Sequence, residues 1–339
     1  MKLIKTQDAV GHVLCHDITQ IIKGVTKDAL FRKGHIVTEE DILLLLSVGK
    51  EHLYVWENDE SMMHENDAAM VLLDMCKNER MSYGEIKEGK IELKSEIHGL
   101  LKVDRKALFT VNSFGQMMIA TRHGNTVVNP GDKLAGMRII PLVIEKKKMD
   151  KVRSLITSPI LEIKPFVLKK AAVITTGSEV YKGRIQDTFT PVIQAKLAEF
   201  GCEMVYHAIC DDDDKMVTEK INEALTQGVD IVLCTGGMSV DPDDKTPGAI
   251  KKSGAEIVTY GAPVLPGAMF LLGYFEDGTP VMGLPGCVMY AKSTIFDIML
   301  PRIAAGMKVS KEDIWALGNG GLCLGCDPCR YPDCAFGKV

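Results

Sequence analysis

The sequence lacks the features that mark membrane-spanning, fibrous and nucleic-acid-binding proteins. No uninterrupted apolar stretch reaches the roughly 18 to 20 residues of a membrane span, and no repeat or low-complexity segment occurs. The first residues contain no apolar core of the kind that a secretory signal needs. A basic surplus is also absent, since the formal net charge is −5, which argues against a dedicated nucleic-acid binder. We therefore expect a cytoplasmic protein that contacts neither membrane nor nucleic acid.

Aromatic residues are scarce as well, at 6%, but hydrophobic residues make up 46% and charged residues 25% of the 339 positions. This is the ordinary balance of a soluble globular chain with enough apolar material for a core, which excludes a disordered chain. At this length, two or three domains are expected.

Cysteine is the residue type in excess, with ten in the chain. In a reducing compartment, scattered cysteines stay as thiols and behave as small buried hydrophobic residues. We expect this of five of them, which are Cys15, Cys76, Cys202, Cys210 and Cys234. Cys287 is the exception, because it follows a predicted strand end and would face a binding crevice there.

The other four cysteines, Cys323, Cys326, Cys329 and Cys334, form a cluster near the end of the sequence. Their spacing is close to the run that ligates an iron–sulfur cluster, although the last gap is one residue longer and no proline follows. Four thiolates also suit zinc. No histidine follows His207, so a zinc site formed by the tail alone would have only sulfur ligands. An iron–sulfur cluster, a zinc ion, and thiols that are redox-active or unliganded stay open as interpretations.

Composition divides the chain into four parts. They are a small α+β domain at 1–57, a mixed, β-rich domain at 70–150, an α/β domain at 165–305 and the cysteine-rich tail at 306–339. Residues 57–69 are acidic and rich in methionine, and we expect them to form a linker. In the first part, Thr38 and Asp41 are predicted to cap a helix that ends before Gly49, and a strand is predicted at 53–56.

In the second part, a helix is predicted at 69–77, a turn at 129–132, and strands at 90–94, 107–111, 117–120 and 138–142. The charged run 145–151 is expected to be a solvated connector. Residues 84–90 match the spacing of a phosphate-binding P-loop. Ile91 stands where a hydroxyl residue would bind Mg²⁺, and no apolar strand precedes the segment, so we interpret it as a polar hairpin or loop.

The third part alternates strands with helices. Strands are predicted at 171–176, 203–209, 230–235, 256–260 and 281–284, and helices at 191–200, 215–226, 247–252 and 289–303. Such alternation predicts an α/β fold, in which a mostly parallel sheet is covered by helices on both faces. Ligands bind such sheets at the carboxyl ends of the strands.

Four polar motifs lie at these predicted strand ends, at Thr175–Glu179, Asp211–Asp214, Thr235–Pro247 and Gly283–Cys287. Their glycines permit tight turns and close approach of a ligand to the backbone, and their hydroxyl and amide groups suit phosphate oxygens. Carboxylates suit Mg²⁺, which neutralises phosphate charge. Together the motifs predict a magnesium-dependent phosphate or pyrophosphate site, although one or two of the aspartates at 211–214 would equally serve as helix caps.

With these motifs, residues 171–303 resemble the molybdopterin-binding domain shared by molybdopterin molybdotransferases, the gephyrin family and molybdopterin adenylyltransferases. The resemblance rests on Thr176–Glu179, Asp211, Thr235–Val240 with Asp244–Pro247, and Gly283–Gly286. Residues 30–56 resemble, more faintly, the small domain of the molybdotransferases. The resemblance implies a three-layer αβα domain and a homodimer.

The resemblance also implies a ligand, molybdopterin or adenylyl-molybdopterin, together with Mg²⁺. In the molybdotransferases the adenylate is hydrolysed as molybdate enters the dithiolene. Carried over by position, Glu179, Asp211 and Asp244 are the catalytic acids, and the last two are the magnesium ligands. The residues that the resemblance places around the cofactor are Thr176, Gly177, Ser178, Asp187, Gly236, Gly237, Ser239, Thr246, Pro266, Gly267, Pro285, Gly286 and Cys287.

The sequence departs from the family's pattern at the residues that would meet anions. Leu265 and Ala268 stand where the family has the lysines of a Lys-Pro-Gly-Lys segment, and Cys287 stands where it has an asparagine. Each lost charge-assisted contact is worth about 1.5–3 kcal/mol. Two functions stay open: a molybdotransferase-like enzyme of molybdenum cofactor biosynthesis, or a non-catalytic protein that carries, senses or delivers the cofactor. In the second, the cysteine tail would contact a molybdoenzyme or biosynthetic partner, or provide redox control.

Overall fold

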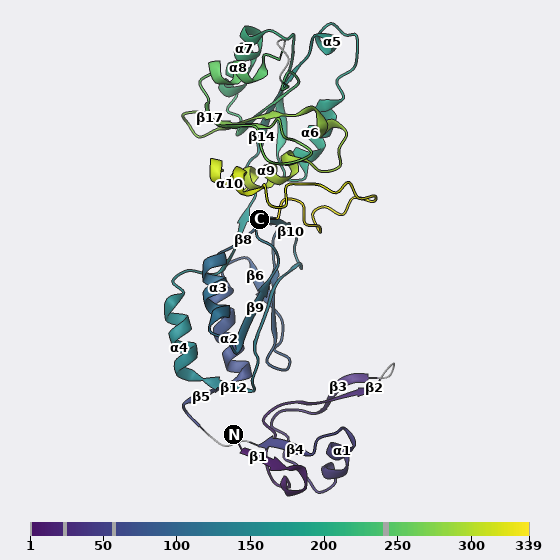
Figure 1. The fold of residues 1–339 in the computed structure, drawn as a ribbon, viewed down its shortest axis with the longest axis vertical. Coiled ribbons are helices and arrows are strands. Elements are labelled where there is room, and N and C mark those ends of the chain that lie inside the picture. Colours follow the sequence, from purple (N-terminus) through teal and green to yellow (C-terminus); the bar gives the residue numbers. More distant parts are fainter. Residues whose placement is uncertain (1, 23–25, 56–58, 240–243, 339) are drawn as a thin grey trace. The chain divides into compact units, whose positions relative to one another are not determined.

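The structure, a computed structural model, describes residues 2–22, 26–55, 59–239 and 244–338 (Figure 1). The chain divides into two compact units. The first comprises Met1–Ser95, Val103–Arg122 and Gly131–Glu162, and the second comprises Glu96–Lys102, His123–Pro130 and Ile163–Val339. No described helix is long and apolar enough to cross a membrane.

The first unit begins with a small α+β part. Its elements are β1 (Lys2–Lys5), the 3-10 helix η1 (Thr6–Asp8), β2 (Ile18–Ile22), β3 (Thr26–Phe31), α1 (Asp41–Ser47) and β4 (His52–Val55). β1 pairs with β4 and β2 with β3, both antiparallel. The Asp41 carboxylate accepts a hydrogen bond from the Thr38 backbone N–H (2.8 Å), so the acid, not the threonine hydroxyl, satisfies an amide at the start of α1. Trp56, predicted to end the last strand, lies outside the described residues.

The rest of the first unit is a four-stranded antiparallel sheet with helices on one face (Figure 1). The sheet order is β6 (Met81–Tyr83), β7 (Ile91–Ser95), β11 (Lys133–Ile139) and β9 (Met117–Thr121). The helices are α2 (Glu65–Cys76), α3 (Arg105–Ser113) and α4 (Lys146–Leu155). β5 (Met62–His64) pairs with β12 (Val143–Glu145). Alternate residues of the sheet, such as Leu93, Ile119 and Met137, are buried beneath the helices.

Three predictions for this unit are wrong. Residues 107–111 are not a strand but lie in α3, because Asp104 accepts a hydrogen bond from the Ala107 backbone N–H and caps the helix. The charged run 145–151 enters α4, which buries Met149 and Val152 one helical turn apart. The supposed linker 57–69 contains β5 and the start of α2, whose N-cap is His64.

Residues 84–90 form the predicted loop, closed by a bridge between Lys87 and Lys90.

The second unit contains a six-stranded sheet. Its order is β15 (Glu203–Cys210), β14 (Lys170–Thr176), β16 (Ile231–Thr235), β19 (Pro280–Leu284), β18 (Leu271–Tyr274) and β17 (Glu256–Tyr260). The first four strands are parallel, and β18 is antiparallel to both of its neighbours. A separate three-stranded sheet has the order β10 (Thr126–Val128), β8 (Gly99–Val103) and β13 (Leu161–Pro165).

Helices cover both faces of the six-stranded sheet, which confirms the predicted three-layer α/β fold. Ala171 and Val173 of β14 belong to a core cluster with residues of α6 (Phe189–Ala198) and α9 (Ile295–Ala304). The intervening Ala172 and Ile174 belong to a second cluster with residues of α7 (Asp214–Thr226) and α8 (Thr246–Lys252). Because side chains alternate along a strand, the apolar run of β14 supplies both cores.

Several short elements were not predicted. They are α5 (Ser178–Tyr181), β18, the 3-10 helix η2 (Gly286–Met289) and α10 (Lys311–Ala316). The last predicted helix begins at Ile295 rather than Met289, since Thr294 and Asp297 form a capping box there. The cysteine-rich tail contacts the same core as α9: Phe336 is buried, and the Tyr331 hydroxyl donates to the Asp297 carbonyl (2.9 Å).

Candidate functional site

A cavity of about 390 Å³ lies at the carboxyl ends of the parallel strands. Its walls come from the residues that follow β16 and β19, from the segment before β18, and from the start of α6. The lining residues are Phe189, Gly236, Gly237, Met238, Ser239, Asp244, Gly267, Ala268, Met269, Pro285, Gly286 and Cys287. Seven of the predicted cofactor-binding positions thus lie around one cavity, together with Asp244.

The loop after β16 requires glycine at two successive positions. Gly236 and Gly237 have φ values of +79° and +54°. A Cβ at Gly236 would lie 2.0 Å from the Thr176 carbonyl oxygen, and one at Gly237 would lie 2.9 Å from the Thr246 hydroxyl. The sequence therefore places a wall of bare backbone at the cavity, which a ligand can approach closely.

Thr176 and Thr246, both predicted to bind cofactor, are instead buried supports of this loop. The Thr176 hydroxyl donates to the Thr235 carbonyl (3.1 Å), and the Thr246 hydroxyl donates to the Gly236 carbonyl (2.9 Å). Neither residue lines the cavity. Both residues therefore affect the shape of the cavity through the glycine loop.

The far side of the loop is held by a tyrosine, Tyr260, that no motif in the sequence marks. The Tyr260 hydroxyl lies 3.0 Å from the Met238 carbonyl and 3.1 Å from the Ser239 carbonyl, so it donates to this pair. Burial raises the pKa of Tyr260, with Asp244 adding to the effect, so the hydroxyl keeps its proton at neutral pH. Residues 240–243, which belong to the predicted motif, lie outside the described residues.

Asp187 does not line the cavity either; it fixes the start of α6. Its carboxylate accepts hydrogen bonds from the backbone N–H groups of Phe189 (2.9 Å) and Thr190 (3.1 Å) and from the Thr175 hydroxyl (3.1 Å). Burial acts to raise the pKa of Asp187, but these hydrogen bonds outweigh it and lower the pKa. The ionised Asp187 thereby positions Phe189, which does line the cavity.

The first two acidic motifs lie away from the cavity. Asp211 pairs with Lys182 (3.4 Å), and Asp212 accepts from the Ser178 backbone N–H (2.9 Å). Asp213 accepts from two backbone amides and caps α7, as the capping alternative predicted. Of the three predicted catalytic acids, only Asp244 lines the cavity, whereas Glu179 and Asp211 do not. Among the described residues, no three His, Cys, Asp or Glu side chains are arranged to hold a metal ion.

The segment before β18 supplies Gly267 and Ala268 to the cavity. Gly267 has a φ of +124°, and a Cβ there would lie 2.4 Å from Ile295 of α9, so only glycine fits. Leu265, at the other position of a family lysine, is 57% exposed and does not line the cavity, and neither does Pro266. Of the two positions that lack the family's lysines, only 268 thus lines the cavity.

The cysteines divide as expected from their positions. The five scattered cysteines are buried, and Cys287 is half-buried at the cavity, where burial raises the pKa of its thiol. In the tail, Cys323 and Cys334 contact the core, whereas Cys326 and Cys329 are exposed. All ten are free thiols, and no metal-binding group is formed by those of the described tail. The iron–sulfur cluster and the zinc ion therefore stay predictions from the spacing of the cysteines.

Three apolar residues that line the cavity, Phe189, Met238 and Met269, were not among the predicted cofactor-binding residues. Met238 is the one with a signal in the sequence, because it directly follows the glycine pair. Gly177 precedes α5 and Ser178 begins it, and both lie outside the cavity lining.

Comparison with known proteins identifies two segments of the chain. Residues 172–305 match the family described as a probable molybdopterin binding domain, and residues 3–57 match a domain of unknown function. A CinA-like protein of Mycobacterium avium is 35% identical over 80 residues, which are 24% of this chain and 18% of that protein. The chain thus spans about a fifth of the length of the curated relatives that it matches.

Two solved structures are similar to this chain over about two fifths of its length. The molybdopterin biosynthesis enzyme MoaB of Thermus thermophilus is 22% identical with a TM-score of 0.36, covering 41% of this chain and 98% of MoaB. The protein CinA of Thermoplasma acidophilum, of unknown function, is 21% identical with a TM-score of 0.35. The match covers 40% of this chain and 98% of the CinA chain. From the family match, residues 172–305 are a domain of the molybdopterin-binding family.

Proposed function

We propose that the chain binds molybdopterin, free or adenylylated, in the cavity after β16 and β19, and carries or delivers it within molybdenum cofactor biosynthesis. The observation that supports this most is the position of the cavity. It lies inside the segment that matches the family, at the strand ends where doubly wound sheets bind ligands. Its volume of about 390 Å³ is within the range of small-molecule sites.

The lining offers two kinds of surface to such a ligand. Gly236 and Gly237 present backbone, and Ser239 adds a hydroxyl, which together suit phosphate oxygens. Phe189, Met238 and Met269 present apolar surface, which suits the flat face of a pterin ring. None of these six residues is charged, so their part is to hold and orient the ligand.

The carrier role is favoured by the missing lysine at position 268 and by the positions of Glu179 and Asp211. This residue lines the cavity where the resembling enzymes have a lysine, so an anion gains no charge-assisted contact there. Glu179 and Asp211 lie outside the lining, and Asp211 is paired with Lys182. A site with one carboxylate and no lysine is suited to hold a cofactor rather than to stabilise an incoming oxyanion.

Molybdate insertion with Mg²⁺ is the second candidate function, and Asp244 favours it. Asp244 lines the same cavity as Ser239, and its carboxylate is of the type that shares a magnesium ion with a phosphate oxygen. In that reaction water cleaves the adenylate, AMP leaves, and molybdate binds the two dithiolene sulfurs.

One experiment separates the two functions. The full chain is titrated with adenylyl-molybdopterin, and AMP release is followed with and without Mg²⁺ and molybdate. We expect binding without AMP release above the uncatalysed background. Asp244→Ala should then leave most of the affinity intact, while Gly286→Ala should reduce it. Magnesium-dependent AMP release that Asp244→Ala abolishes would establish the second function, and absence of binding would reject both.

A further inference from the structure

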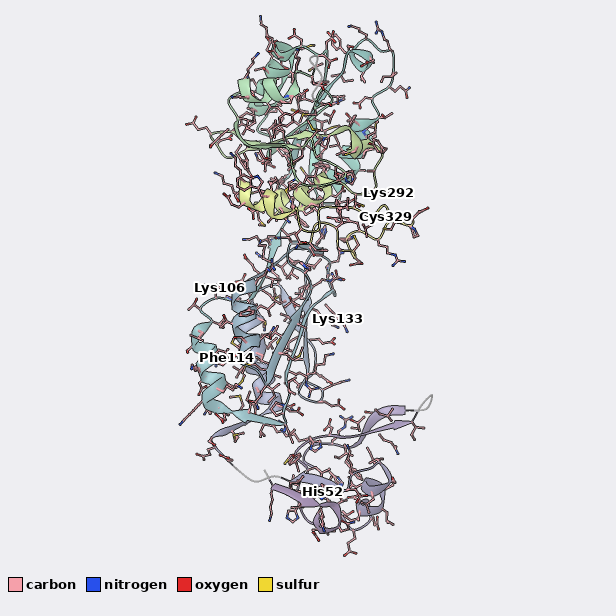
Figure 2. The ribbon with its side chains drawn as sticks, viewed as in Figure 1. His52, Lys106, Phe114, Lys133, Lys292 and Cys329 are labelled. Carbon is pink, nitrogen blue, oxygen red and sulfur yellow. The ribbon has the colours of Figure 1, made fainter. Side chains whose placement is uncertain are left out.

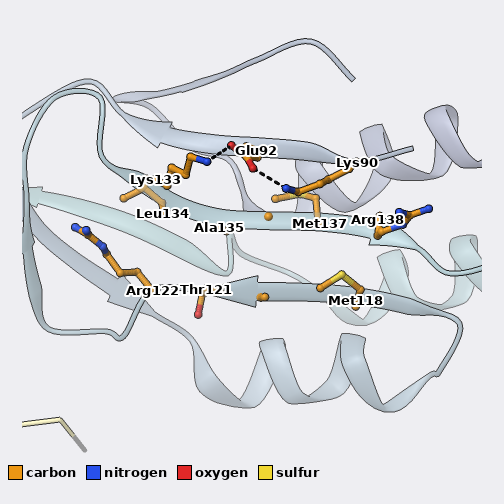
Figure 3. A pocket seen from close by; sticks show the side chains of 12 residues that line it. Lys90, Glu92, Met118, Thr121, Arg122, Lys133, Leu134, Ala135, Met137 and Arg138 are labelled. Carbon is orange, nitrogen blue, oxygen red and sulfur yellow. Dashed lines mark hydrogen bonds and ion pairs between the residues drawn. The ribbon is translucent and has the colours of Figure 1, made fainter. Parts of the chain in front are cut away.

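The four-stranded sheet of the first unit carries a pocket of about 380 Å³ on the face opposite α2 and α3 (Figure 3). Residues that alternate with the buried ones, among them Glu92, Met118 and Arg138, point into it. This pocket lies outside the segment that matches the molybdopterin-binding family. Its chemistry is therefore independent of the function proposed above.

The floor of the pocket is made of small residues. In the sheet register, Gly136 of β11 is opposite Glu92 of β7 on one side and Ala120 of β9 on the other. A row with glycine and alanine at its centre leaves a hollow between longer side chains. The added Cβ at Gly136 would meet the Lys90 side chain at 3.7 Å, so the lysine stem forms one wall of this hollow.

Four cations surround the floor: Lys90, Arg122, Lys133 and Arg138. Figure 3 shows Arg122 and Lys133 toward one end of the pocket and Lys90 and Arg138 toward the other. Only one carboxylate, Glu92, is among the lining residues. This concentration of positive charge contrasts with the formal net charge of −5 on the whole chain.

Glu92 holds the two lysines over the floor. Its carboxylate contacts the Lys90 ammonium at 2.7 Å and the Lys133 ammonium at 2.9 Å. Hydrogen bonds from Lys90 and Lys133 lower the pKa of Glu92 to about 2, so it stays ionised at neutral pH. An incoming anion must therefore compete with a carboxylate for both ammonium groups, which favours a ligand with more than one negative charge.

The two arginines are anchored at the margins by acids outside the lining. Arg122 contacts Asp132 at 3.0 Å, and Arg138 contacts Glu65 at 3.6 Å. These acids offset part of the positive charge and fix the direction of each side chain. A guanidinium carries five N–H donors, so a single carboxylate contact leaves donors for a second anion.

We propose that this pocket binds a small molecule that carries a diphosphate or longer phosphate chain, with its phosphates between the two cation pairs. Four cations suit the several charges of a polyphosphate, and a floor without large side chains admits its bulk. A long acidic peptide or an RNA fits less well, because the hollow is limited to about 380 Å³ and the rest of the chain would repel an extended polyanion.

The test is calorimetric titration of the full chain with inorganic pyrophosphate, inorganic phosphate and sulfate at fixed ionic strength. We expect pyrophosphate to bind at least about tenfold more tightly than the two single anions. Equal binding of all three anions would mean an adventitious ion only and would overturn the proposal. Tighter binding of a short RNA or an acidic peptide would overturn it as well.

Two lysine variants test whether pyrophosphate binds in this pocket. Lys133 is 68% exposed at the pocket, and Lys106 is an exposed lysine of α3 in the same unit (Figure 2). Lys133→Ala should weaken pyrophosphate binding about tenfold, whereas the matched control Lys106→Ala should change it less than about twofold. Equal effects of the two variants would refute the site.

Glu92→Gln provides a second readout that does not depend on loss of binding. It removes the competing charge while keeping the size of the side chain, so pyrophosphate affinity should rise several-fold. A fall in affinity, with the thermal unfolding midpoint unchanged, would contradict competition between Glu92 and the ligand. Molybdopterin binding by the second unit should be unaffected by every variant of this pocket.

Discussion

The hydroxyl groups of Thr176 and Thr246 lie 3.1 Å apart beneath the glycine loop that borders the cavity. Thr176 ends β14 and Thr246 begins α8, so their contact joins two segments seventy positions apart in the sequence. Because Thr246 also donates to the Gly236 carbonyl, the pair fixes the loop from below. The shape of the cavity wall thus depends on residues that do not line it.

Replacement of Thr246 by valine tests this support. The variant keeps the shape of the side chain but leaves the Gly236 carbonyl without its donor, so we expect a loss of about 1–3 kcal/mol in the free energy of unfolding. Ligand affinity should fall as the loop loses its position. Thr246→Ser, which keeps the hydroxyl, should retain most of both, as urea unfolding and a binding titration will show.

Two glycines of the cavity should respond differently to alanine. Gly236→Ala forces a side chain at a φ of +79° into the Thr176 carbonyl, so the variant should unfold at a markedly lower temperature. Gly286 has no atom within 4 Å of an added Cβ, so Gly286→Ala should keep the unfolding midpoint. It should still weaken ligand binding, since the methyl group enters the cavity lining. Unchanged affinity in Gly286→Ala would place the ligand elsewhere.

Lysine at Ala268 should restore an anion contact. Ala268 lines the cavity and Leu265 does not, so Ala268→Lys should increase the affinity for molybdate or the ligand phosphate about tenfold or more. Leu265→Lys is the matched control and should have little effect, because that position is exposed away from the cavity. A larger gain from Leu265→Lys would reverse this assignment of the two positions.

Asp187 should give the protein part of its acid sensitivity. Hydrogen bonds lower its pKa in the folded state below the unfolded value of about 3.9. The ionised group therefore stabilises the fold above that pH, and this stabilisation is lost as pH falls through the folded-state pKa. Asp187→Asn should show a smaller loss of unfolding free energy between pH 6 and pH 3 than the wild type, measured by urea unfolding. Identical pH profiles would show that Asp187 has no such role.

The exposed tail cysteines should react as ordinary accessible thiols. A hydrogen bond from the Ser293 hydroxyl, with Oγ and Sγ 3.5 Å apart, lowers the pKa of Cys329, which increases its thiolate fraction. Iodoacetamide should therefore label Cys329 and Cys326 before the buried cysteines, and Ser293→Ala should slow labelling of Cys329. Stoichiometric iron with sulfide, or zinc, in anaerobically purified protein would instead support a metal site at these cysteines.

The α/β fold was predictable because its apolar strands end in glycine and acid motifs, as at Thr176 and Gly236. The helix α3 was not, since Leu108, Phe109 and Val111 have the composition of a strand, and the deciding hydrogen bond comes from Asp104. The sequence predicted that the glycine motifs and Asp244 lie at one site. It did not predict that Glu179 lies outside the cavity that they line. Each acid follows a strand of the same sheet, and side-chain partners such as Lys182 then direct it away.

The second unit includes 96–102 and 123–130, which lie inside the sequence of the first. Val127 and Phe166 contact the main core of the second unit. The His98 ring meets Phe166 edge-on, with centroids 4.9 Å apart, and is parallel to Phe200 at 6.4 Å. A fragment cut at the edges of the matched family segment, 172–305, would lack the three-stranded sheet and would leave Phe200 without His98 and Phe166. The smallest piece that retains all of these contacts is discontinuous in sequence, so the matched segment cannot be excised as one continuous piece without losing part of its core.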